Sequence, residues 1–207
     1  MNRRTFVSAA SALALTRGLR GQCQATPAGP LCTATVDIPN HLSAIHTQDC
    51  PEWCWAASIS MIFGFYNHEV EQEDIVRQVY GTLQCFPAGT RTIPQALSRA
   101  WTDADGQKFR SRVVAAYDPL NGVSAINNAI IVNELQNDRP LLYCNTHHAM
   151  VVGGVVFYPT PNPTITTVGV IDPWPSNPRL HNLSQAEMYP IPAGQMTFVA
   201  TIRVEDV

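Results

Sequence analysis

The spacing of apolar residues changes near residue 140, and this change limits the folds open to the chain. Before Pro140 the apolar positions repeat about every 3.6 residues, as in amphipathic helices, and after it they alternate with a period of 2, as in strands. Helices therefore come first and an antiparallel sheet second, a segregation typical of the α+β class. We expect an α+β fold with an N-terminal helical lobe and a C-terminal antiparallel sheet lobe.

One expected helix differs from the others because it is apolar on nearly every side. It runs from Trp53 to about Tyr66, and a helix of this kind is buried. Helical spacing predicts further helices over 70–80, 93–101 and 124–136. Alternation predicts strands over 110–117, 141–144, 149–158, 164–171 and 196–204. Residues 26–49 are rich in Pro, Thr and Gly and are expected to form an extended lead-in.

Composition excludes several classes of protein. The chain has 207 residues, of which 45% are apolar and 14% charged, enough for one folded domain with a buried core. No apolar run reaches the roughly 18–20 residues of a membrane span, so we expect none. A formal net charge of -3 argues against a general nucleic-acid binder.

The first 20 residues carry four arginines and no acid. Arg3-Arg4-Thr5-Phe6-Val7 followed by an Ala- and Leu-rich stretch resembles a bacterial twin-arginine signal. We expect a signal peptide over 1–25, a hydrolase domain over 26–207, and delivery to the periplasm or outside the cell. An amphipathic N-terminal helix is the alternative.

Four residues form a pattern typical of nucleophilic catalysis. Cys54 lies at the start of the apolar helix, His148 opens a strand, and Asp172 ends the next strand. A helix N-terminus and a nearby imidazolium both stabilise a thiolate, and a carboxylate can orient the imidazole. Gln48, six residues before Cys54, could donate to an oxyanion together with the Cys54 backbone N–H. On an alternating strand His147 and His148 point to opposite faces, and the Ala-Met-Val sequence that follows favours His148.

The same residues resemble the papain-like cysteine peptidases. The matching segments are Gln48-x5-Cys54-Trp55-Ala56, His148-Ala149-Met150-Val151-Val152-Gly153 and Asp172-Pro173-Trp174. Their order of glutamine, cysteine, histidine and asparagine or aspartate is that of the family. The resemblance implies a papain-like fold, Cys54 as nucleophile, His148 as base and acid, Asp172 as orienting residue and Gln48 as oxyanion residue. It implies hydrolysis of protein or peptide substrates through a thioester on Cys54, with no cofactor and no metal.

Three departures indicate the short bacterial branch of this family, which includes bacteriocin-processing-peptidase-like domains and bacterial effectors. The gap from Cys54 to His148 is shorter than the roughly 130–150 residues of the plant and lysosomal enzymes. One extra residue separates Cys50 from Cys54, and the third member is Asp rather than Asn. The sequence names no specificity pocket and no oligomeric state.

The six cysteines leave other interpretations open. By resemblance to the family's bridge near the nucleophile, Cys50 is expected to pair with Cys85. If Cys23 leaves with the signal, elimination pairs Cys32 with Cys144. A structural zinc site is a rival, with ligands Cys50, Cys54, Cys144 and His148. An inactive papain-like binding module, or an acyltransferase or amidase with the same triad, would also fit.

Overall fold

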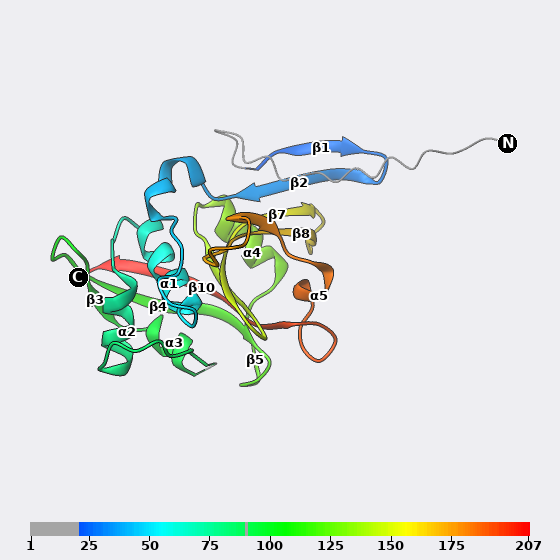
Figure 1. The fold of residues 1–207 in the computed structure, drawn as a ribbon. Coiled ribbons are helices and arrows are strands. Elements are labelled where there is room, and N and C mark those ends of the chain that lie inside the picture. The colour runs from blue at the N-terminus through cyan, green and yellow to red at the C-terminus, as the bar shows by residue number, and fades with distance from the viewer. Residues whose placement is uncertain (1–20, 90) are drawn as a thin grey trace.

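The computed structural model describes residues 21–89 and 91–207 of the chain (Figure 1). Its helices are the 3-10 helix η1 (Ile38–Ala44), α1 (Cys54–Phe65), α2 (Gln72–Tyr80), α3 (Thr92–Ala96), α4 (Asn128–Gln136) and α5 (Gln185–Met188). Its strands are β1 (Cys23–Thr26), β2 (Gly29–Thr35), β3 (Ala100–Thr102), β4 (Lys108–Asp118), β5 (Val123–Ser124), β6 (Leu141–Asn145), β7 (Ala149–Tyr158), β8 (Thr164–Ile171), β9 (Leu180–Asn182) and β10 (Met196–Asp206). The α+β class is confirmed.

The strands form one sheet in which every named pair is antiparallel, in the order β1-β2-β7-β6-β10-β4-β3. Strand β7 also pairs along its length with β8, and β8 continues into a hairpin with β9. The C-terminal strand β10 lies inside the sheet, between β6 and β4. The first strands are added at the far end, where the β1–β2 hairpin extends from the body (Figure 1).

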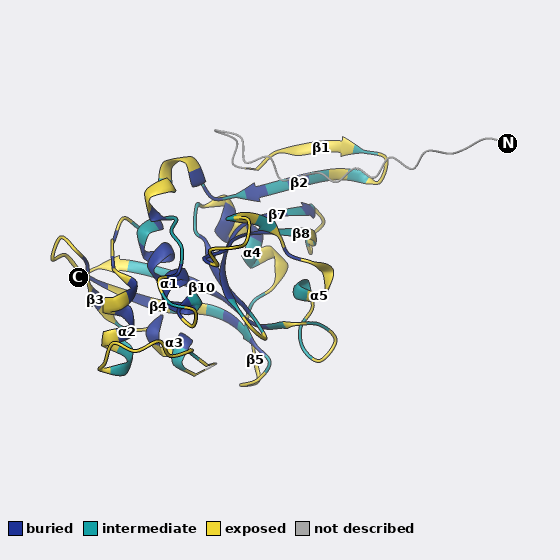
Figure 2. Ribbon diagram, viewed as in Figure 1, coloured by how far each residue is buried: buried dark blue, intermediate teal, exposed yellow. Residues whose placement is uncertain are grey.

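Helix α1 is the central helix that its apolar sequence predicts. Ten of its twelve residues are buried, and it packs against β7, β6, η1 and α2. Figure 2 shows α1 and the middle of the sheet as buried, in contrast with the exposed β1. Gly64 allows η1 to approach α1, because a Cβ at this position would lie 2.6 Å from the Cβ of Ala44. This contact fixes the segment that leads from η1 into α1.

Two expected helices differ from the structure. The helix expected over 93–101 is wrong in its second half, since Trp101 lies in β3 opposite Phe109 and its indole N–H donates to Ser111 Oγ at 3.1 Å. Cross-strand pairing therefore outweighs the helical spacing there. The helix expected from residue 124 begins at Asn128, because the Asn127 side chain accepts from the Ile130 backbone N–H at 2.9 Å and caps it.

The N-terminal lead-in is more ordered than its composition predicts, because it contains the β1–β2 hairpin and η1. A disulfide joins Cys23 to Cys32, which stand directly opposite each other in this hairpin. The expected Cys32–Cys144 pairing is therefore wrong, and Cys144 is a free thiol buried in β6. The expected Cys50–Cys85 pairing is confirmed.

The expected signal at residues 1–25 falls mostly outside the described residues, although β1 and its disulfide extend across the expected boundary. Within the part of the chain that the structure describes, no helix has both the length and the apolar character needed to cross a membrane.

Candidate active site

Cys54 occupies the first position of α1, and the surrounding loops hold it there. Trp53, the residue before the helix, donates its indole N–H to Gln84 O at 3.0 Å, and Trp55 donates its own to Phe86 O at 3.1 Å. The Cys50–Cys85 disulfide joins the same two segments. The thiol is free and only partly buried, at the positive end of a buried helix dipole.

His148 lies at the turn between β6 and β7, where Asn145 holds its backbone. Asn145 Oδ1 accepts from the backbone N–H groups of His147 and His148 at 2.9 and 2.7 Å, and the Asn145 N–H donates to His148 O at 2.9 Å. The His148 side chain is mostly buried, whereas His147 is exposed. The side chain that reaches Asp172 is therefore that of His148, and its catalytic role stays a prediction.

Asp172 lies directly after β8 and is 1% exposed. His148 Nε2 donates to its Oδ1 at 2.6 Å, and the Trp174 backbone N–H donates to the same oxygen at 2.8 Å. Asn177 Nδ2 donates to Oδ2 at 2.7 Å. Burial alone would raise the pKa of the Asp172 carboxyl, but these three hydrogen bonds hold it below its ordinary value. The carboxylate is therefore ionised at neutral pH.

The two nitrogens of His148 have different partners. Since Nε2 is bonded to Asp172, Nδ1 is the nitrogen that faces the Cys54 side chain. Burial by itself would lower the pKa of His148, but hydrogen bonds with Asp172 and Cys54 raise it to about 9. The imidazole is thus protonated at neutral pH, and an imidazolium beside a cysteine favours the nucleophilic thiolate.

Trp174 contacts the ring of His148. Its ring meets the His148 ring edge-on, with centroids 6.0 Å apart at 89°, and 36% of its surface stays exposed. The indole therefore packs against the His148 ring while remaining partly open to solvent.

Gln48 is buried in the loop before α1. Its Nε2 donates to Cys50 O at 3.0 Å and Pro51 O at 2.7 Å, and its buried Oε1 has no hydrogen-bond partner among the described residues. Its backbone N–H donates to Pro173 O at 2.9 Å, next to Asp172. Both amide protons therefore brace the turn that leads into Cys54, and its role at an oxyanion stays a prediction.

Cys144 lies on the α1 side of the sheet but has no place in the triad. Burial, with the nearby charges of Cys54 and Asp118, raises the pKa of its thiol far above the ordinary range. It is therefore a neutral, buried thiol that lies close enough to Cys54 to be influenced by its charge. The rival Cys3His zinc site is excluded because Cys50 is bonded to Cys85, and no metal-binding group of side chains occurs within residues 21–89 and 91–207.

Sequence reasoning missed Asn145, Asn177 and Arg179, which hold the triad through the backbone or through Asp172. Arg179 Nη1 donates to Asp172 O at 2.9 Å. Asn177 and Arg179 lie in the polar, Pro-rich segment after β8, and this is the only signal that the sequence offers. The hydrogen-bond partners of all three residues depend on how the loops fold.

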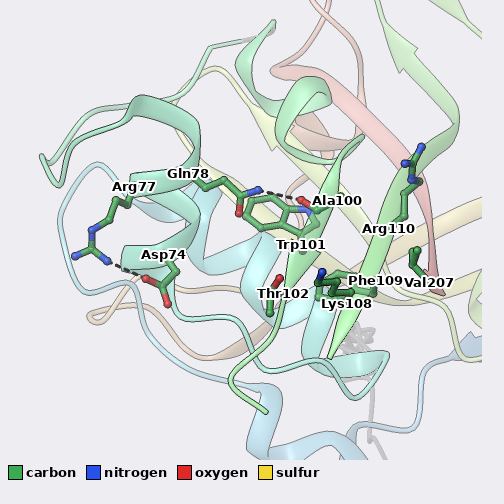
Figure 3. A pocket seen from close by; sticks show the side chains of 10 residues that line it. All are labelled: Asp74, Arg77, Gln78, Ala100, Trp101, Thr102, Lys108, Phe109, Arg110 and Val207. Carbon is green, nitrogen blue, oxygen red and sulfur yellow. Dashed lines mark hydrogen bonds and ion pairs between the residues drawn. The ribbon is translucent and has the colours of Figure 1, made fainter. Parts of the chain in front are cut away.

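Two pockets lie apart from these residues. One of about 600 Å³, between α2 and the β3–β4 edge, is lined by Arg77, Lys108 and Arg110 (Figure 3). Another, of about 820 Å³, is lined by uncharged side chains of β6, α4 and β8, including Tyr143 and Ile131. Neither contains Gln48, Cys54, His148 or Asp172, so the triad is a separate site.

Comparison with known families agrees with this geometry. The family model described as papain-like cysteine protease AvrRpt2 matches residues 32–187, which include the triad and Gln48. No curated protein matches the chain. The match covers well over half of the sequence, and the family is one of cysteine-type peptidases. The chain therefore belongs to the AvrRpt2 family of papain-like cysteine proteases.

Proposed function

We propose that this peptidase is exported from a bacterial cell and cleaves peptide bonds through a thioester on Cys54, with His148 as acid and base. The observation that carries the proposal is the placement of His148, with Nε2 on a buried carboxylate and its other nitrogen on a thiol at a helix N-terminus. This arrangement favours a thiolate–imidazolium pair before substrate binds.

In the acylation step the Cys54 thiolate attacks the carbonyl carbon of the scissile peptide bond. A carbon–sulfur bond forms and the carbonyl electron pair moves onto oxygen. As that pair returns, the carbon–nitrogen bond breaks and the His148 imidazolium gives its proton to the departing amine. Asp172 keeps the imidazole oriented throughout, because its carboxylate is fixed by Asn177 and the Trp174 backbone.

In the deacylation step the now neutral His148 takes a proton from water, and the hydroxide equivalent attacks the thioester carbon. The carbon–sulfur bond breaks, a carboxylic acid is released, and the thiolate and imidazolium are restored. The net reaction consumes one water and needs no cofactor.

The tetrahedral intermediates place a negative charge on oxygen near the start of α1. The Cys54 backbone N–H is one donor of the proposed oxyanion site and Gln48 Nε2 the other, which requires Gln48 to release one of its two loop carbonyls when substrate binds. A donor of this kind is typically worth about 10²–10³ in rate. Gln48→Ala should therefore lower kcat by that factor and leave Cys54 reactive toward iodoacetamide.

The first experiment is alkylation of Cys54 with limiting iodoacetamide at about pH 6, read by peptide mass mapping, beside peptide-library cleavage. We expect selective labelling of Cys54, its loss in His148→Ala, and normal labelling in the exposed control His147→Ala. Cys54→Ala should abolish cleavage and retain the fold. Full activity in Cys54→Ala would overturn the mechanism, and product masses separate hydrolysis from transfer to another acyl acceptor.

Export is proposed from the paired arginines at positions 3 and 4, and the two disulfides are compatible with an oxidising compartment. Replacing Arg3 and Arg4 with lysine should retain the protein in the cytoplasm, which fractionation measures. The intact mass of the exported protein will also show where the signal ends. Processing after Ala25 would leave the Cys23 fragment attached to Cys32 through the disulfide alone.

A further inference from the structure

The connection between β8 and β9 is a loop closed by its two end residues. Ile171 and Leu180 form the last strand pair, and the loop between them runs from Asp172 to Arg179. The Asp172 N–H donates to Arg179 O at 2.9 Å, and Arg179 Nη1 donates to Asp172 O at 2.9 Å. Arg179 thus fixes the backbone of the residue whose carboxylate orients His148.

The same nitrogen of Arg179 also reaches the other half of the site. Its Nη1 donates to His46 O at 3.0 Å, in the segment that leads through Gln48 to Cys54. A single backbone bond, from Gln48 N to Pro173 O at 2.9 Å, runs beside it. Among the described residues, no other side chain hydrogen-bonds across these two segments.

The chemistry of arginine suits this position. A guanidinium keeps its proton at any physiological pH, so both hydrogen bonds persist across the working range. The adjacent His46 side chain is partly buried, and burial is the main cause that lowers its pKa. Arg179 therefore lies beside a neutral imidazole, and its own hydrogen bonds go to carbonyl oxygens.

We propose that Arg179 is a positioning residue that sets the spacing between the Cys54 segment and the Asp172 loop. It contacts no reacting atom and acts through the backbone of Asp172 and His46. Without it, the Asp172 loop is tied to the Cys54 segment by one backbone bond, and the ring of His148 loses its fixed approach to the thiol. The effect on turnover rests on the proposed function, whereas the effect on Cys54 reactivity does not.

The test compares Arg179→Gln and Arg179→Lys with matched changes at Arg110, an exposed arginine of β4 that lines the pocket in Figure 3. We expect Arg179→Gln to lower kcat by about 10- to 100-fold with KM changed by less than about threefold, because small misplacements of reacting groups have effects of this size. The iodoacetamide rate at Cys54 near pH 6 should fall by a similar factor. Arg179→Lys should recover part of both rates, and the Arg110 variants should match the wild type.

Alkylation is followed by mass mapping at Cys54 itself from pH 5 to 9, because three histidines, His46, His148 and His181, lie near this loop. A purely structural role would lower the unfolding midpoint and leave kcat and the alkylation profile of the folded variants unchanged, and that result would overturn the proposal. If Arg179→Gln does not fold, the test compares Arg179→Lys with Arg110→Lys, using kcat and the alkylation rate at Cys54. Absence of wild-type peptide cleavage would refute the proposed function alone, since the alkylation rates would still test Arg179.

Discussion

Replacing Asp172 with asparagine tests the charge arrangement of the site most directly. The change keeps the size of the side chain and the oxygen that accepts from Trp174 N, and Asn177 can turn its amide to accept from the new NH2 group. Only the negative charge beside His148 is lost. The variant also carries the amide that the wider papain-like family uses at this position.

The size of the effect follows from the hydrogen bond between His148 and Asp172, at 2.6 Å. Bonds to a charged partner contribute about 1.5–3 kcal/mol and bonds between neutral partners about 0.5–1.5 kcal/mol, so the charge contributes about 1–2 kcal/mol. One pKa unit corresponds to 1.36 kcal/mol, so the pKa of His148 should fall by about 0.7 to 1.5 units from its value of about 9.

The sign of the pH effect is fixed by which form of His148 is active. Acylation needs the imidazolium, which exists below its pKa, so the alkaline limb of kcat/KM should lie near pH 9 in the wild type. In Asp172→Asn this limb should move down to about pH 7.5–8.3. The assay is kcat/KM for a fluorogenic peptide between pH 5 and 10, with the exposed Asp74→Asn as control. An alkaline limb that stays near pH 9 in Asp172→Asn would refute the reasoning.

Three further predictions concern stability. Cys50→Ser opens a loop whose ends, Cys50 and Cys85, are 35 residues apart, and should lower the free energy of unfolding in urea by about 4 kcal/mol. The Glu134 carboxylate is buried, yet its two arginine partners lower its pKa to about 2. This lowered pKa contributes up to about 3 kcal/mol to the free energy of unfolding. The contribution should be complete above pH 4.5 and lost as the pH falls through 2, and Glu134→Gln should flatten this pH dependence. Gly64→Ala should cost about 1–3 kcal/mol through its clash with Ala44, and Ala44→Gly in the same chain should restore most of the loss in urea titrations.

Sequence patterns predict those parts of the fold that depend on local spacing. The four strands expected after residue 140 match β6, β7, β8 and β10 closely, because each is a short run rich in apolar residues that ends at a turn, a signal contained in the segment itself. Helix α1 is predicted for a similar reason, since its apolar character on all sides already requires burial. The spacing around Trp101 fits a helix as well as a strand, and only the pairing of β3 with β4 decides its conformation.

The same distinction holds for the site. Sequence predicts that Cys54, His148 and Asp172 come together, because each stands at or next to the end of a predictable helix or strand. Arg179 could not be predicted in this way, because its partners are backbone carbonyls whose positions depend on two loops folding together. The disulfide of Cys23 does not follow from sequence, because the expected signal at 1–25 includes this residue and only the hairpin register brings it opposite Cys32.

The position of β10 has a consequence for the order in which the sheet can close. Cys54 lies early in the sequence and His148 later, and the strand made last among the described elements occupies an interior place between β6 and β4. Until β10 leaves the ribosome, β6, which leads into the His148 turn, has no neighbour on that edge, and β4 has no connection to the rest of the sheet. In a chain that lacks β10, the β3–β4 part of the sheet is therefore separated from the rest, and the strand that leads into the His148 turn keeps an unpaired edge.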